Sequence, residues 1–210
     1  ALEIDPTYAL AWAGVADSYT VGNGTYLGIT PQESQTKSMA AVKRALELDD
    51  SLAEAHTTLA DRLHYVEWDW QGSEREFRRA IELNPGYATA YQWYAELLGA
   101  WGRFDESIEA AKKAEQLDPL SPAMPGSVAG AYHTARKFDD AAAWYLKALE
   151  MEPTLDIALF QLAELYVSTG QFDNAVEIWQ RIFGYWGLED HAERLGIRYA
   201  EEGQTAYWQT

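Results

Sequence analysis

Histidine and carboxylate side chains are the groups of this chain that could perform acid–base or metal chemistry. No two of the histidines have the spacing of metal ligands, and the motifs HExxH, GxxxxGK[ST] and GxGxxG do not occur. We therefore expect no cofactor and no metal site, and we interpret each histidine alone: His56 as structural, His64 and His133 as possible ligand contacts, and His191 as part of a helix start.

Neighbouring acidic residues offer a second chemistry, because a glycosidase uses two carboxyl groups that face each other across a cleft. Asp49-Asp50 and Asp139-Asp140 are instead adjacent in sequence and stand at expected helix boundaries, where carboxylates cap helix ends. Glu189-Asp190-His191 suits a helix start, since acids are favoured near the positive end of the helix dipole. We predict that the chain is not an enzyme.

The composition narrows the partners that such a chain can bind. The 210 residues carry 16 basic and 33 acidic side chains and no cysteine. A surface this acidic repels phosphate backbones and anionic membranes, so neither nucleic acid nor membrane is expected, whereas a basic partner is compatible. The absence of cysteine excludes disulfides and fits a reducing, cytoplasmic location. The chain begins with Ala1 rather than Met, and we interpret it as a piece of a longer protein.

A recurring phrase identifies the elements that position these side chains. Ala80-Ile-Glu-Leu-Asn-Pro85 has counterparts that end at Pro119 and Pro153, each 34 residues further on. Two more copies end at Pro6 and Asp50, and their wider interval of 44 residues predicts an insertion, with a glycine-rich loop at 21–29. Thr30-Pro31-Gln32-Glu33 then predicts a capping box and a longer second helix.

Each repeat predicts two helices that approach closely. Small residues recur in the first helix, namely Ala16, Ala60, Ala95, Ala129, Ala163 and Gly196. Others recur in the second helix, namely Ala45, Ala80, Ala114 and Ala148. Gly102 and Gly170 stand between the helices, where a positive φ is favourable. Arg136 and Glu67 stand near this turn in other repeats, and Gly187 replaces the closing proline, which predicts altered packing there.

With this pattern of small residues, glycine turns, aromatics and closing prolines, the chain resembles the tetratricopeptide-repeat (TPR) family. The resemblance implies an all-α TPR superhelix, or α-solenoid, of about five helix pairs plus a terminal helix. The expected boundaries are 1–6 for the end of a preceding repeat, five pairs at 7–50, 51–86, 87–120, 121–154 and 155–187, and a terminal helix and tail at 188–210. The segment from Trp68 to Pro85 is also similar to the TPR tails of bacterial regulators with winged-helix, serine/threonine kinase or adenylate cyclase domains.

In the TPR family the first helix of each pair lines the concave face. The resemblance therefore implies partner contacts at Asp17, Asp61, His64, Gln92, Glu96, His133, Phe160 and Glu164. The acids recur at one position, so we expect a channel that attracts Lys or Arg. Five aromatic residues are hard to bury in this register and could anchor a partner or cover helix ends, namely Trp68, Trp93, Trp101, Tyr185 and Trp186.

Three functions remain open at this point. The first is a protein–protein interaction scaffold that serves as the regulatory or partner-binding arm of a larger bacterial protein. The second is a small-molecule-sensing domain of a signalling or transcription regulator. The third is self-association through apolar stripes at the ends of the solenoid.

Overall fold

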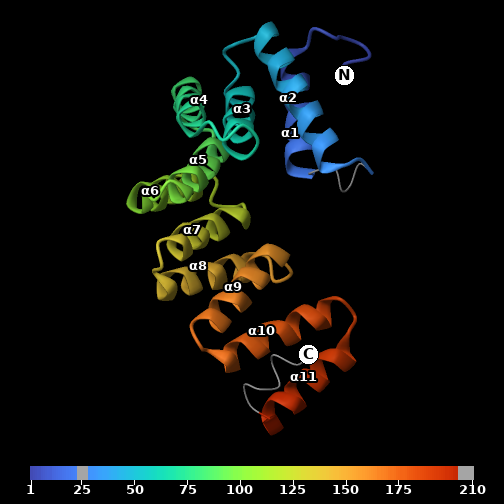
Figure 1. Cartoon of the computed structure of the whole chain (residues 1–210), viewed down its shortest axis with the longest axis vertical. Coiled ribbons are helices and arrows are strands. Elements are labelled where there is room, and N and C mark those ends of the chain that lie inside the picture. The colour runs from blue at the N-terminus through green and yellow to red at the C-terminus, as the bar shows by residue number, and fades with distance from the viewer. Residues whose placement is uncertain (23–27, 203–210) are drawn as a thin grey trace. The chain divides into compact units, whose positions relative to one another are not determined.

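The computed structural model describes residues 1–22 and 28–202, in which the regular secondary structure is helical (Figure 1). The chain divides into two compact units, Ala1–Leu117 and Asp118–Thr210, and each is described by itself. Unit 1 contains α1 (Ala9–Gly22), α2 (Pro31–Leu48), α3 (Ala53–Tyr65), α4 (Trp70–Leu83), α5 (Ala88–Ala100) and α6 (Phe104–Leu117). Unit 2 contains α7 (Ala123–Thr134), α8 (Phe138–Met151), α9 (Asp156–Ser168), α10 (Phe172–Tyr185) and α11 (Glu189–Glu202).

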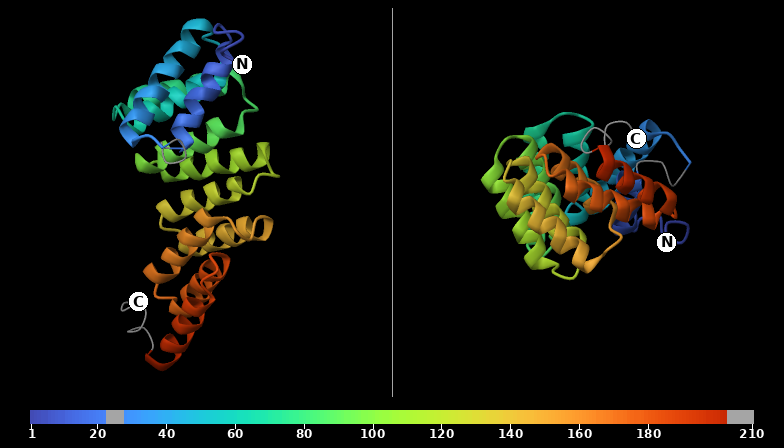
Figure 2. Two further views of the ribbon diagram at one scale, coloured as in Figure 1. Left: turned by 90° about the vertical axis from the view of Figure 1, so that its right-hand side faces the viewer. Right: turned by 90° about the horizontal axis from the view of Figure 1, so that it is seen from below.

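Consecutive helices pack as pairs within each unit. The pairs are α1 with α2, α3 with α4 and α5 with α6 in unit 1, and α7 with α8 and α9 with α10 in unit 2. Neighbouring pairs stack, because α2 and α4 contact the first helix of the next pair and α8 contacts α9 (Figure 2). The first helices also contact one another, α1 with α3, α3 with α5 and α7 with α9. This arrangement confirms the predicted all-α repeat.

Small side chains lie where the helices of a pair meet, as predicted. In the first helices Ala16, Ala60, Ala95, Ala129 and Ala163 are buried, and in the second helices so are Ala45, Ala80, Ala114 and Ala148. A small residue lets two helices approach closely, and the larger neighbours fill the remaining space.

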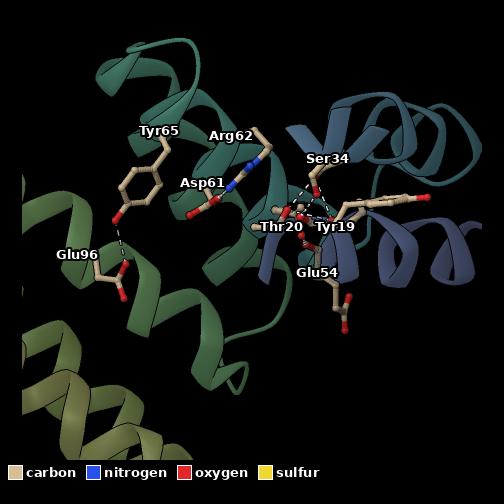
Figure 3. A network of polar contacts seen from close by, with 11 residues as sticks. Tyr19, Thr20, Ser34, Glu54, Asp61, Arg62, Tyr65 and Glu96 are labelled. Atoms are coloured by element: carbon tan, nitrogen blue, oxygen red, sulfur yellow. Dashed lines mark hydrogen bonds and ion pairs between the residues drawn. The ribbon is translucent and has the colours of Figure 1, made fainter. Parts of the chain in front are cut away.

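Serine hydroxyls of the second helices also bond to the first helices. Ser38 Oγ donates to the carbonyl oxygen of Ala16 at 3.0 Å, and Ser107 Oγ donates to that of Ala95 at 2.7 Å. Ser34 Oγ donates to the carbonyl oxygen of Tyr19 at 2.7 Å (Figure 3). Each of these bonds joins the two helices of one pair.

The turns between paired helices use a residue in the left-handed region. Gly102 has φ 80° and Gly170 has φ 75°, as predicted, and Arg136 takes the same place with φ 59°. In the pair of α3 and α4 the positive φ, 57°, belongs to Trp68 rather than to the neighbouring Glu67. Non-glycine residues pay a steric cost in this conformation, so Trp68 and Arg136 are strained positions.

Gly187 does not act as a substitute for the closing proline. It has φ 69°, and the following Leu188 N–H donates to the carbonyl oxygen of Phe183 at 2.8 Å. The same bond closes α9, where Gln171 N–H donates to the carbonyl oxygen of Tyr166 at 2.8 Å. The link from α10 to α11 is therefore a turn of the kind found inside a pair.

The first pair has the long second helix that the sequence predicts. Helix α2 has 18 residues against 14 in α4, and Thr30 and Glu33 form the capping box: the backbone N–H of Glu33 donates to Thr30 Oγ1, and that of Thr30 donates to Glu33 Oε2. Residues 23–27 of the glycine-rich loop and the tail 203–210 lie outside the described residues. Residues 1–6, expected to be a helix end, form a turn in which Asp5 N–H donates to the carbonyl oxygen of Ala1 at 2.9 Å.

His56 ties three parts of unit 1 together. Its Nδ1 lies 2.6 Å from Glu76 Oε2 on α4, and its Nε2 lies 2.8 Å from the carbonyl oxygen of Asp50, which follows α2. The hydrogen bond to Glu76 is the main cause that raises the pKa of His56. The structure thus gives His56 the structural role that its position predicts.

Candidate interaction surface

The first helix of each pair carries an unusual balance of charge. Helices α1, α3, α5, α7 and α9 contain one arginine, no lysine and six acids: Asp17, Glu54, Asp61, Glu96, Asp156 and Glu164. The second helices α2, α4, α6, α8 and α10 contain ten basic and fourteen acidic residues. The near absence of basic side chains is therefore a property of the first helices.

Three of these acids come together in unit 1, one from each of the neighbouring helices α1, α3 and α5. Burial raises the pKa of Asp17 and Glu96, and the charge of Asp61 raises both further. The pKa of Glu96 reaches about 7. The Glu96 side chain nevertheless remains open to solvent, so water screens much of the energy of this shift. These carboxyl groups thus influence one another across three helices.

Asp61 differs from the other two because it is only 7% exposed. Its Oδ2 accepts a hydrogen bond from Arg62 Nε at 3.0 Å and also pairs with Arg62 Nη2 (Figure 3). Burial still raises the pKa of Asp61, and the Arg62 charge opposes the rise. The expectation of a direct partner contact at Asp61 is therefore corrected: the carboxylate is buried and already paired.

His64 is corrected for a similar reason. Its ring is buried against Tyr65, with 4.2 Å between centroids, and edge-on to Trp70 at 5.8 Å. Burial lowers the pKa of His64, and the nearby Asp61 opposes this shift. Packing around Trp70 removes the imidazole from the surface where a contact was expected.

Tyr65 is a member of this surface that the sequence reasoning missed. Its hydroxyl donates to Glu96 Oε2 at 3.2 Å, and burial raises the pKa of the phenol strongly (Figure 3). Tyr65 follows Asp61 by four residues, and this spacing places both on one side of α3. This spacing of four residues from Asp61 is the sequence feature from which the position of Tyr65 could have been predicted. Gln92, a predicted contact, is half-buried one turn before Glu96 on α5.

In unit 2 the predicted contacts His133 and Glu164 lie near each other. Burial lowers the pKa of His133, whose half-buried ring packs edge-on against Phe138 and Tyr145. The charge of Glu164 opposes that shift and adds to the raised pKa of Tyr145. Glu164 itself is exposed. Since it belongs to unit 2, a channel shared with the acids of unit 1 remains a prediction.

Phe160, the remaining predicted contact, belongs to an aromatic cluster. Its ring centroid lies 5.6 Å from that of Trp179 and 5.6 Å from that of Trp186. Phe183 joins them, 5.9 Å from Trp179 and 6.4 Å from Trp186. The cluster comprises Phe160, Trp179, Phe183 and Trp186.

No group of three or more His, Cys, Asp or Glu residues in the described part of the chain is placed to hold a metal ion. Among residues 1–22 and 28–202, no helix combines the length and apolar character that a membrane span needs.

The helix pairs with buried small residues define an all-α repeat protein. A family model described as "Tetratricopeptide repeat" matches residues 76–109 and 144–177. Each matched segment has the predicted length of one repeat and runs from the second helix of one pair into that of the next. These two segments match the tetratricopeptide repeat, and the helix pairs form the all-α solenoid fold of such repeats.

Two curated relatives contain a similar segment as part of a longer protein. Over 175 residues the chain is 20% identical to "Anaphase-promoting complex subunit 3" of Schizosaccharomyces pombe, covering 83% of this chain and 25% of that protein. Over 168 residues it is 28% identical to human "Protein O-mannosyl-transferase TMTC3", covering 77% of this chain and 18% of that protein. The chain thus spans a quarter or less of the length of these relatives.

Solved structures share the same fold. PilW, a type IV pilus biogenesis factor, matches with a TM-score of 0.73 at 20% identity, over 96% of this chain and 89% of PilW. YrrB, described as a TPR protein with an unusual peptide-binding site, matches with a TM-score of 0.55 at 15% identity, over 92% of this chain and 95% of YrrB. At these identities the likeness shows the fold alone.

Proposed function

We propose that this chain is an interaction scaffold that binds a partner protein or peptide, and that the partner presents Lys or Arg to the first helices. The observation that carries the proposal is the charge balance of those helices, one arginine against six acids. That arginine, Arg62, is already paired with Asp61. An acidic surface concentrates negative potential and attracts cations.

Asp17 and Glu96 are the groups of unit 1 that a basic partner would meet. Asp17 is half-buried and Glu96 exposed, and both lie near enough to Asp61 to sense its charge. Gln92 offers an amide one turn before Glu96, and Glu164 is the exposed acid at the corresponding repeat position of unit 2. Added salt should weaken such binding, because exposed charges are screened over about 8–10 Å at physiological ionic strength.

The test uses a fluorescent Gly-Ser peptide that carries four lysines and a counterpart that carries four glutamates. The lysine peptide should bind, and Glu96→Lys should weaken its binding about three- to tenfold, because reversing an exposed charge removes one attraction and adds a repulsion. Fluorescence anisotropy at several salt concentrations measures both effects.

Glu109→Lys is the matched control for this test. Glu109 is an exposed acid on α6, the second helix of the pair that contains Glu96, and its reversal changes the net charge equally. The proposal expects little change from this variant. If Glu96→Lys and Glu109→Lys weakened peptide binding equally, the effect would come from net charge alone. That result would contradict a binding site on the first helices.

We propose further that the chain is the regulatory or partner-binding arm of a larger cytoplasmic bacterial protein. Support comes from the similarity of the segment from Trp68 to Pro85 to such tails and from the small share of its relatives that the chain covers. The sequence encoded before Ala1 tests this proposal. A winged-helix, kinase or cyclase domain there is the expected result, and a parent protein without a signalling domain would contradict it.

A further inference from the structure

One stripe of α9 in unit 2 runs from the edge of the core to solvent, because Phe160 is half-buried against the core whereas Ile157 and Glu164 are exposed. Ile157, Phe160 and Glu164 are three and four residues apart and therefore share one side of the helix. Ile157 is 62% exposed and Glu164 is exposed, whereas Leu159, Leu162 and Ala163 of the same helix are fully buried. The stripe thus places an exposed apolar side chain, a half-buried aromatic ring and an exposed carboxylate next to one another.

The aromatic cluster extends this apolar surface to the end of α10. Phe160 contacts Trp186, yet Trp186 is still 49% exposed. A Trp side chain is a large apolar body with a polar N–H, and such residues often carry much of the binding energy of an interface. The exposed half of this indole is therefore apolar surface that a partner could cover.

The backbone holds Trp186 in place before any partner arrives. The backbone N–H of Trp186 donates to the carbonyl oxygen of Ile182 at 3.1 Å, and the backbone N–H of Gly187 donates to that of Gly184 at 3.1 Å. Phe160 and Phe183 contact the ring itself. A side chain that is already ordered loses little conformational entropy on binding, which favours affinity.

The charges around this apolar surface indicate the kind of occupant. Helices α7 and α9 contain no Lys or Arg, and α9 contributes Asp156 and Glu164. Glu189 and Asp190 begin α11 directly after the turn that follows Trp186. A second copy of this chain, with its formal charge of −17, would be repelled.

We infer that Phe160 and Trp186, bordered by Glu164, form an anchor site for an aliphatic or aromatic side chain of a partner polypeptide, next to a Lys or Arg of that partner that meets Glu164. This inference rests on the proposed function and names the kind of segment that unit 2 takes. The apolar side chain covers the exposed rings, and the adjacent cation neutralises the carboxylate.

A phage-displayed library of random 12-residue peptides, selected on the whole chain, tests the site. Selected peptides should share an apolar residue beside Lys or Arg. Trp186→Ser should lower the affinity of a synthetic selected peptide about tenfold or more, as loss of an interface anchor does. Glu164→Gln should lower it about two- to fivefold and reduce its salt dependence.

Tyr185→Ser is the matched control. Tyr185 is 46% exposed and adjacent to Trp186 in sequence, but it is not a member of the aromatic cluster, so its removal should leave affinity unchanged. Far-UV circular dichroism and melting temperature verify that each variant is folded. Equal losses from Tyr185→Ser and Trp186→Ser would overturn the anchor site.

The two proposals fail in different ways. Selected peptides that lose binding to Glu96→Lys but not to Trp186→Ser would overturn the anchor and keep the proposed acidic face. A selection that enriches no peptide would also overturn the anchor site. Binding of the four-lysine peptide separately tests the proposal that a basic partner meets the acidic residues of the first helices. Self-association in light scattering that Trp186→Ser abolishes would identify a second copy as the occupant and overturn the partner segment.

Discussion

The two units repeat the same helix pairs but present different chemistry at corresponding positions. In unit 1 the first helices carry Asp17, which is half-buried, Asp61, which is buried and paired with Arg62, and Glu96, which is exposed. In unit 2 the corresponding side of α9 carries Phe160, in contact with Trp186, and the exposed acids Asp156 and Glu164.

This difference shows what the repeat constrains and what it leaves free. Ala95 in unit 1 and Ala129 in unit 2 are both buried where paired helices meet, so close packing requires a small residue in either unit. The residue that follows each is Glu96 in one case and Gly130 in the other, and a Cβ added at Gly130 would meet no atom within 4 Å. Packing positions are therefore shared, and the chemistry of the exposed positions belongs to each unit.

The largest expected effect tests the shared packing. Ala95→Leu and Ala129→Leu should each lower the free energy of unfolding by about 1–3 kcal/mol, because added methyl groups overpack a close helix contact. Urea denaturation followed by circular dichroism measures the loss. Ala100→Leu, at an exposed position of α5, is the control and should change stability little. An unchanged stability of Ala95→Leu would mean that the register of the repeat is wrong.

The next effect separates the two units at one repeat position. Asp61→Asn should destabilise the fold by about 1–2 kcal/mol, because the buried Arg62 loses its ionic partner. Glu164→Gln, at the corresponding exposed position, should have an effect within about 0.5 kcal/mol. Equal effects in the same denaturation experiment would remove the distinction between a buried and an exposed acid.

A smaller effect in the opposite direction concerns the turns. Trp68→Gly in unit 1 and Arg136→Gly in unit 2 should each stabilise by about 0.5–1 kcal/mol, because glycine adopts a positive φ without steric cost. Thermal melts of the two variants provide the comparison. Trp68 is 73% exposed, so its replacement sacrifices little packing. A loss of stability in Trp68→Gly alone would show that the indole has a structural role in unit 1.

The smallest effect is a dependence on pH that unit 1 should show at Glu96. The folded pKa of about 7 lies above the ordinary value of a glutamate, so the folded state binds the proton more tightly than the unfolded state. This contribution is complete below about pH 4.5 and is lost as the pH rises to about 7. Glu96→Gln should therefore be more stable than the original chain at pH 8, by well under about 1 kcal/mol given solvent screening.

Paired melts at pH 5 and pH 8 check this prediction. The lowered pKa values of His64 and His133 make stability rise with pH, which is opposite to the effect of Glu96. Both histidines are present in Glu96→Gln and in the original chain, so their contribution cancels when the two are compared. Glu164→Gln is the control, because its carboxyl group is exposed in unit 2. A difference between Glu96→Gln and the original chain that is independent of pH would contradict the assignment.

The fold was predictable from sequence because its signals are local or periodic. The spacing of Pro85, Pro119 and Pro153 indicated the repeat, and Gly102 and Gly170 have the positive φ that their positions predicted. Gly187 stands where the closing proline is expected, and the sequence predicted altered packing there without indicating that the backbone forms a turn like that at Gly170. Position in a repeat alone did not distinguish these two turns.

The candidate surface was less predictable, because it depends on contacts between helices. The register identified which side of the first helices carries Asp61 and His64. The register could not show that Arg62 pairs with Asp61 and that Trp70 packs against His64. The contact of Phe160 with Trp186 joins residues 26 positions apart, one on α9 and one directly after α10, and the repeat pattern does not predict this contact.

The hydrogen bonds of His56 have a consequence for how the chain behaves in different buffers. A carbonyl oxygen only accepts hydrogen bonds, so Nε2–H donates to Asp50, and in the protonated ring Nδ1–H donates to the Glu76 carboxylate. While the ring is protonated, neither nitrogen has a lone pair that could coordinate a metal ion. Because its folded pKa is raised, the stability that this cation contributes is complete below about pH 6.5 and is lost as the pH rises through the folded pKa.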